Sequence, residues 1–273
     1  MLDSRKREIR IQANLFRINC KTGRYGIIDL FKECERKGYK LLRYPLGNSA
    51  DLGFTVKKDN DIVIFTNSCS RLSREIFTLA HEIGHAVLHL KYKTSFIDDK
   101  GTINGRSTDE KEQEANYFAA CLLMPLDDVD RFIDFEIPGF QEKGLTAMDI
   151  ARVMSEFSVS FDMALNRLES LGVIDSNQKV CLDNEKIKNR VGNLLRSVGG
   201  NARLNEPSRE INIPYEYINY VIYNYNHNAI PKETLERALA CYQLNIEDIS
   251  DKLVEHSDDG DDDLDDLIGG LDD

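Results

Sequence analysis

Hydrophobic positions recur at helical spacing in two long segments near the middle of the chain. Residues 71–90 contain no proline, and their apolar side chains share one face: Leu72, Ile76, Leu79, Ala80, Ile83, Val87 and Leu88. Ser70 or Ser68 is suited to cap the start of this helix. A second helix is predicted from about Ser107 to Met124, where Pro125 ends it.

The segments before these helices alternate between apolar and polar residues, as short strands do. We predict a helix over residues 27–37 and strands over residues 39–44, 52–57 and 61–66, the last two joined by a turn at residues 58–60. A helix, a small antiparallel sheet and two further helices indicate an α+β fold.

The second half of the chain has mostly helical spacing. Residues 145–174 resemble a helix-turn-helix, with a turn at residues 158–160. Further helices are predicted within residues 213–225, from Pro231 onward and around residues 246–253. We therefore expect four parts: a core (1–137), a helix-turn-helix-like segment (138–182), a helical C-terminal region (183–255) and an acidic tail (256–273).

Charge is concentrated at the C-terminal end. The chain has 273 residues and a net charge of −12, and nine aspartates follow His256 with no lysine or arginine among them. Without these nine charges the rest of the chain has a net charge near −3. We expect a disordered tail that aids solubility, or that repels nucleic acid or contacts a basic partner.

Composition excludes several other classes of protein. Apolar runs such as residues 62–65 are far shorter than a membrane span, and residues 1–25 carry no apolar signal-peptide stretch. We expect a cytoplasmic protein without membrane contact. The six cysteines include no C-x-x-C pair, which argues against a zinc ribbon and against a disulfide framework.

The sequence His81-Glu82-Ile83-Gly84-His85 carries the strongest chemical signal. Histidines four residues apart lie about one helical turn apart, so both imidazoles leave the same face and reach one tetrahedral zinc ion. Glu82 falls beside that face, which suits proton transfer with water better than metal binding. Gly84 costs roughly 1 kcal/mol in a helix interior relative to alanine, and therefore suggests that a neighbouring group passes close by.

A third ligand is expected on the second helix, which contains Glu110, Glu112 and Glu114. Glu112 shares a face with small residues that permit close helix approach, and Asn116 lies one turn further on. Asn116 is thus placed to hydrogen-bond a ligand histidine. The alternative for Glu112 is a capping role with Asp109.

These motifs carry a family resemblance. Residues 81–89, together with residues 112–125, resemble the ImmA/IrrE metallopeptidases, and the resemblance covers roughly residues 20–175. It implies that the core is a gluzincin-like peptidase in which His81, His85 and Glu112 bind Zn²⁺. It further implies that Glu82 is catalytic and that the substrate is a helix-turn-helix transcriptional repressor of a mobile element or a stress response.

A different class of protein remains as the alternative: a non-catalytic regulator that binds a partner repressor or DNA, with zinc structural or absent. Structural zinc sites usually have four protein ligands, whereas three candidates are present here, which favours the enzyme. The second helix of the helix-turn-helix-like segment offers Asn166 and Arg167 but also Asp162 and Glu169. We therefore do not expect direct nucleic-acid binding.

Overall fold

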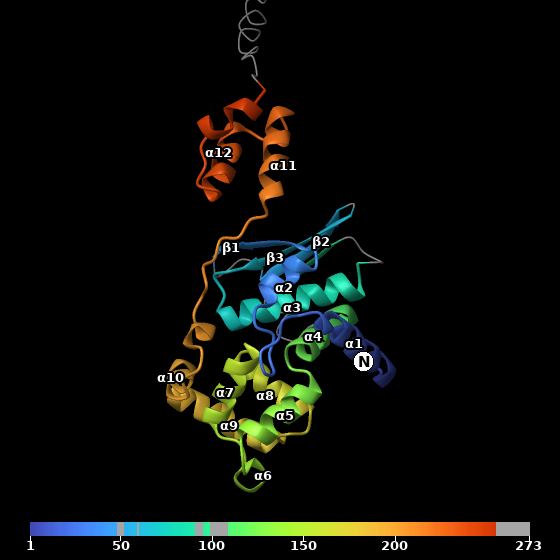
Figure 1. The fold of residues 1–273 in the computed structure, drawn as a ribbon, viewed down its shortest axis with the longest axis vertical. Coiled ribbons are helices and arrows are strands. Elements are labelled where there is room, and N and C mark those ends of the chain that lie inside the picture. The colour runs from blue at the N-terminus through green and yellow to red at the C-terminus, as the bar shows by residue number, and fades with distance from the viewer. Residues whose placement is uncertain (48–51, 59, 91–94, 99–108, 255–273) are drawn as a thin grey trace, which may run out of the picture. The chain divides into compact units, whose positions relative to one another are not determined.

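The computed structural model describes residues 1–47, 52–58, 60–90, 95–98 and 109–254 (Figure 1). Its strands are β1 (Lys40–Tyr44), β2 (Gly53–Lys58), β3 (Asp61–Asn67) and β4 (Ser95–Asp98). The helices of the first half are α1 (Asp3–Ile18), α2 (Leu30–Arg36), α3 (Leu72–Leu88), α4 (Glu110–Leu123) and α5 (Leu126–Glu136). They are followed by α6 (Phe140–Lys143), α7 (Ala147–Phe157), α8 (Phe161–Ser170), α9 (Ser176–Asn189), α10 (Val191–Ser197), α11 (Tyr215–Asn226) and α12 (Lys232–Cys241), and by the 3-10 helices η2 (Ala202–Asn205) and η3 (Glu247–Lys252).

The described residues form two compact units, which divide after Asn212: residues 1–212 and residues 213–254. The boundaries expected at residues 137 and 182 both fall inside the first unit, and the predicted tail (256–273) lies outside the described residues. Among the described helices, none combines the length and the hydropathy of a membrane span.

The sheet confirms the α+β prediction but not the expected strand directions. Its order is β1-β3-β2-β4, in which β2 pairs antiparallel with both β3 and β4 while β1 pairs with β3 in parallel. A turn this short between β2 and β3 forces them to be antiparallel. The connection from β1 to β2 is longer, and these two strands are not adjacent in the sheet. Instead, β1 pairs with β3, which lies between β1 and β2. Hydrophobic alternation reports which residues form strands, not which strands pair.

Helix α3 lies between the sheet and α4, and α1 packs on α4 (Figure 1). The close approach predicted at Gly84 is confirmed, because a Cβ atom there would lie 3.1 Å from the Cα atom of Ala115 on α4. The predicted serine cap is wrong: α3 follows Arg71 without a side-chain cap, and the Ser68 hydroxyl instead donates to the Glu210 carbonyl.

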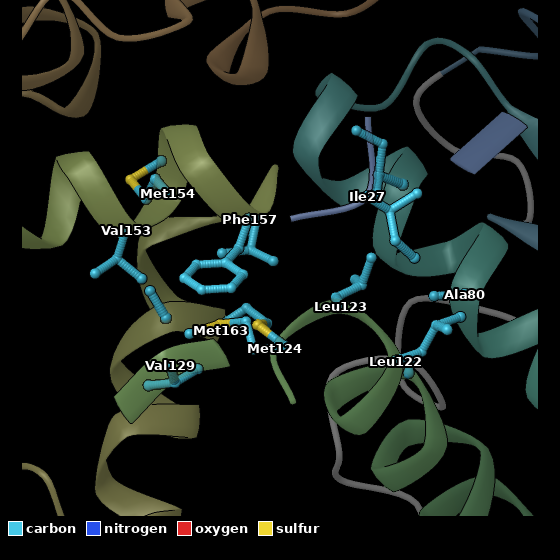
Figure 2. Packing of buried hydrophobic residues seen from close by; sticks show 14 of the residues in the cluster. Ile27, Ala80, Leu122, Leu123, Met124, Val129, Val153, Met154, Phe157 and Met163 are labelled. Carbon is cyan, nitrogen blue, oxygen red and sulfur yellow. The ribbon is translucent and has the colours of Figure 1, made fainter. Parts of the chain in front are cut away.

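One hydrophobic cluster runs through the first unit from α1 to η2. Figure 2 shows Met124, which follows α4, near the side chains of Phe157 and Met163, and Leu122 of α4 near Ala80 of α3. The predicted helix pair is present as α7 and α8, with Ser158 in a left-handed conformation at the turn and Ser160 capping α8. The same cluster includes buried residues of α4, the helix that carries the predicted third ligand, and Arg167 of α8 donates to the carbonyl of Met124 at the end of α4.

The second unit has a core of its own. Its buried residues come from α11, α12 and η3: Ile218, Val221, Ile222, Leu235, Leu239 and Ile249. The helices predicted from residues 213–225 and from Pro231 are therefore present, with Pro231 immediately preceding α12.

Candidate metal centre

Two imidazole nitrogens face each other on the buried side of α3. The Nε2 atoms of His81 and His85 are 3.0 Å apart, and both side chains are fully buried. The spacing of one helical turn brings them together, as the sequence predicts.

The carboxylate of Glu112 faces both histidines from α4. Its Oε2 lies 3.3 Å from His81 Nε2, and its Oε1 lies 3.4 Å from His85 Nε2. Burial raises the pKa of Glu112, but hydrogen bonds from the two imidazoles, when these carry protons at Nε2, outweigh burial and hold the pKa well below its usual range. The capping alternative is not seen, since the Asp109 side chain accepts a hydrogen bond from the backbone N–H of Lys111.

The three side chains form a donor set suited to a metal ion. One ligand atom from each of His81, His85 and Glu112 lies within 4.8 Å of the others. Two zinc-bound donors in tetrahedral geometry are roughly 3.4 Å apart, close to the separations seen here. An ionised carboxylate and imidazole lone pairs repel each other at such distances, so a cation between them would stabilise the arrangement.

Hydrogen bonds on the far side of each imidazole fix which nitrogen faces the cluster. Asn116 Oδ1 lies 3.0 Å from His81 Nδ1, the contact expected from its position one turn after Glu112. Because an amide oxygen only accepts, His81 Nδ1 carries the proton and its Nε2 presents a lone pair to the cluster.

A longer chain of contacts supports His85. Its Nδ1 is 3.0 Å from His89 Nδ1, and His89 Nε2 is 3.0 Å from Glu114 Oε2. Arg5 on α1 in turn donates to Glu114, with Nε 2.7 Å from Oε1. The Arg5 guanidinium lowers the pKa of Glu114, and burial lowers the pKa of His89 despite the opposing carboxylate. An ionised Glu114 accepts a hydrogen bond from His89 Nε2–H. The neutral His89 then accepts a hydrogen bond at Nδ1 from His85 Nδ1–H. His85 Nε2 therefore has a lone pair that can bind a metal.

Glu82 follows His81 on the face of α3 that contacts the sheet. Its carboxylate is fully buried, and its Oε2 accepts a hydrogen bond of 2.5 Å from the Thr55 hydroxyl on β2. A Cβ atom at Gly53 would lie 2.7 Å from Glu82 Oε1, so only glycine leaves room for the carboxylate at that position of β2. The strand thus fixes the orientation of Glu82.

Sequence reasoning missed the residues that support this site from a distance. No element was predicted over residues 3–18, although Ile9, Ala13 and Phe16 have helical spacing and are buried in α1. That pattern would have revealed the helix, but not that Arg5 contacts Glu114. Thr55 likewise looks like any strand threonine until the sheet is assembled.

An α+β fold with two histidines, a glutamate ligand candidate and a buried glutamate in H-E-x-x-H order defines a metallopeptidase-type domain. Residues 34–169 match the family model described as the IrrE N-terminal-like domain, Peptidase_M78. Residues 34–169 are thus similar to that peptidase family, and the resemblance seen in the sequence is confirmed over this domain.

A phage protein is also similar. The "uncharacterized immunity region protein 2" of Bacillus phage phi105 is 31% identical over 100 residues, which are 37% of this chain and 56% of the phage protein. The chain thus spans little more than half the length of this relative.

Proposed function

We propose that this protein is a zinc-dependent endopeptidase that cuts a helix-turn-helix transcriptional repressor in the cytoplasm. The observation that supports it best is the convergence of His81, His85 and Glu112 beside the buried Glu82, within a peptidase-family domain. In this proposal the two imidazoles and the Glu112 carboxylate are the zinc ligands. Three protein ligands are typical of catalytic rather than structural zinc sites.

Zinc held there would polarise the scissile carbonyl and make the attacking water more acidic. Glu82 takes the proton from that water and later delivers it to the leaving amide nitrogen. The hydrogen bond from Thr55 holds the Glu82 carboxylate in one orientation, and burial among apolar neighbours strengthens its interaction with a positive centre. Asn116 and His89 keep the imidazole lone pairs directed at the ion.

The choice of substrate rests on the family and on the surface of the helix pair. The phage relative is described as an immunity region protein, which is consistent with a regulatory substrate. Arg167, a basic residue of α8 that a DNA reader would expose, is buried and donates to the Met124 carbonyl. The α7–α8 pair therefore suits packing against α4 better than contact with DNA.

The test is to incubate the zinc-loaded protein with the helix-turn-helix repressor encoded next to it and to map the products by mass spectrometry. We expect one discrete cut by the wild-type protein, slowed roughly 10²–10⁴-fold by Glu82→Gln. Equal cutting by Glu82→Gln would exclude the enzymatic role. Comparable digestion of an unrelated unfolded protein such as casein would indicate a general peptidase.

A further inference from the structure

A cavity lies in the first unit, beside the start of α3. Its volume is about 590 Å³, and its walls come from the start of α3, the middle of α4 and the α8 helix. None of His81, His85 or Glu112 is among the described residues that line it, although Asn116 is. The volume falls within the roughly 300–1,000 Å³ typical of small-molecule sites.

The charged side chains around this cavity are mainly cationic. Arg71, Arg74, Arg167 and Lys186 line it, and among the described lining residues Asp162 is the one carboxylate. That carboxylate pairs with Lys186, which also contacts Asp183. The described lining therefore has more cationic than anionic side chains.

Arg167 is the most unusual of the three arginines because it is only 4% exposed. Its Nε donates to the Met124 carbonyl at 2.9 Å, and its Nη2 lies 3.7 Å from Cys121 Sγ. Within the described part of the chain no carboxylate forms an ion pair with Arg167. A buried charge whose partners are neutral is costly, and a nearby anion would reduce that cost.

The N-terminus of α3 adds to the positive potential of the cavity. This 17-residue helix starts after Arg71 without a side-chain cap, and Ser73 and Arg74 of its first turn line the cavity. The backbone N–H groups at a helix start carry partial positive charge. Burial lowers the pKa of Arg74, and the positive charge of the neighbouring Arg71 lowers it further.

We propose that this cavity binds a small molecule bearing a phosphate or carboxylate group. Arg71 and Arg74 contact the anion at the start of α3, Arg167 supplies positive charge from beneath, and the side chains of Ser73 and Asn166 offer hydrogen bonds. The cavity borders the proposed metal centre at Asn116, which contacts His81, but the proposal does not depend on peptidase activity.

The test is isothermal titration calorimetry on the zinc-loaded full-length protein, with inorganic phosphate and succinate as separate probes. We expect one of the two to bind with one molecule per chain, which identifies the anion class. Arg71→Gln and Arg74→Gln should each weaken that binding by about tenfold or more, as expected for loss of a charge-assisted contact. Arg152→Gln is the matched control, because Arg152 is an exposed arginine of α7 that pairs with Asp149 away from the cavity.

Three results would overturn the proposal. The first is that neither probe binds. The second is equal binding by the wild-type, Arg71→Gln and Arg74→Gln proteins. The third is binding that Glu112→Ala abolishes and Arg74→Gln leaves intact, which would place the anion on the metal. Thermal midpoints of all variants separate lost binding from lost folding, and the exposed Arg71 allows the test even if Arg74→Gln is unstable.

Discussion

Glu114 lies on the same helix as Glu112, but its carboxylate contacts His89, which in turn contacts the candidate ligand His85. It accepts from Arg5 on one side and from His89 on the other, and His89 contacts the far nitrogen of His85. Three side chains thus determine which nitrogen of His85 faces Glu112. Outer contacts of this kind orient ligand histidines and raise their basicity.

This arrangement predicts that Glu114→Ala weakens zinc binding by roughly 10–100-fold, because His89 loses the acceptor that fixes its tautomer. Glu114→Gln, which retains an oxygen acceptor, should recover part of the affinity. Competition with a chromophoric chelator measures the zinc dissociation constant. Glu8→Ala is the control, since Glu8 also contacts Arg5, at 2.8 Å, but is exposed. Wild-type affinity in Glu114→Ala would show that the chain of contacts does not support the ligand.

The sequence predicted those features of the candidate site that depend on the spacing of residues along one helix. The helical spacing of His81, His85, Glu112 and Asn116 is enough to place them on two facing surfaces. Glu114 shares its side of the helix with Phe118 and Cys121, and the sequence gives no sign of its contact with Arg5, more than a hundred residues earlier. Contacts between distant segments depend on tertiary packing, which periodicity does not report.

The α3–α4 contact is the element on which the metal centre depends. A Cβ atom at Gly84 would lie 3.1 Å from Ala115 Cα and 3.2 Å from the Ala115 carbonyl oxygen. These are backbone atoms, which cannot rotate away as a side chain can. A larger residue at Gly84 must therefore push α4, and Glu112 with it, away from the histidines.

We predict that Gly84→Ala destabilises the fold by about 1–3 kcal/mol, although the same change in an open helix position stabilises by up to about 1 kcal/mol. The thermal midpoint from circular dichroism tests this, and zinc affinity should fall together with it. Gly192→Ala in α10 is the control, because its Cβ atom would lie 3.6 Å from its nearest neighbours, the side chains of Arg196 and Asn205. A stabilised Gly84→Ala protein would mean that the two helices adjust without cost.

At the scale of the whole molecule, the two hydrophobic clusters do not share residues. The larger cluster ends at Leu204, and the smaller one begins at Ile218. The helix pair α7–α8 belongs to the first cluster, although the sequence suggested a separate segment at residues 138–182. Helical spacing identified both helices. It does not show whether they form a core of their own or join the core that contains α4 and α5, because that depends on tertiary packing.

A chain ending at Asn212 should therefore fold and bind one zinc ion, with a thermal midpoint within a few degrees of that of the first unit in the full chain. The reason is that the truncation removes no residue of the larger cluster. Calorimetry together with metal analysis measures both quantities. Aggregation or loss of zinc in the shortened chain would show that residues 213–254 complete the first unit.

The central claim is that His81, His85 and Glu112 hold the metal while Glu82 does not. It is tested most directly by zinc per chain, measured by mass spectrometry on wild-type, Glu112→Ala and Glu82→Gln proteins purified side by side. Both substitutions remove a buried carboxylate from the same pair of helices, so they differ mainly in the role assigned to it. The account predicts about one zinc for the wild-type and Glu82→Gln proteins and almost none for Glu112→Ala. Zinc retained by Glu112→Ala, or lost from Glu82→Gln, would contradict it.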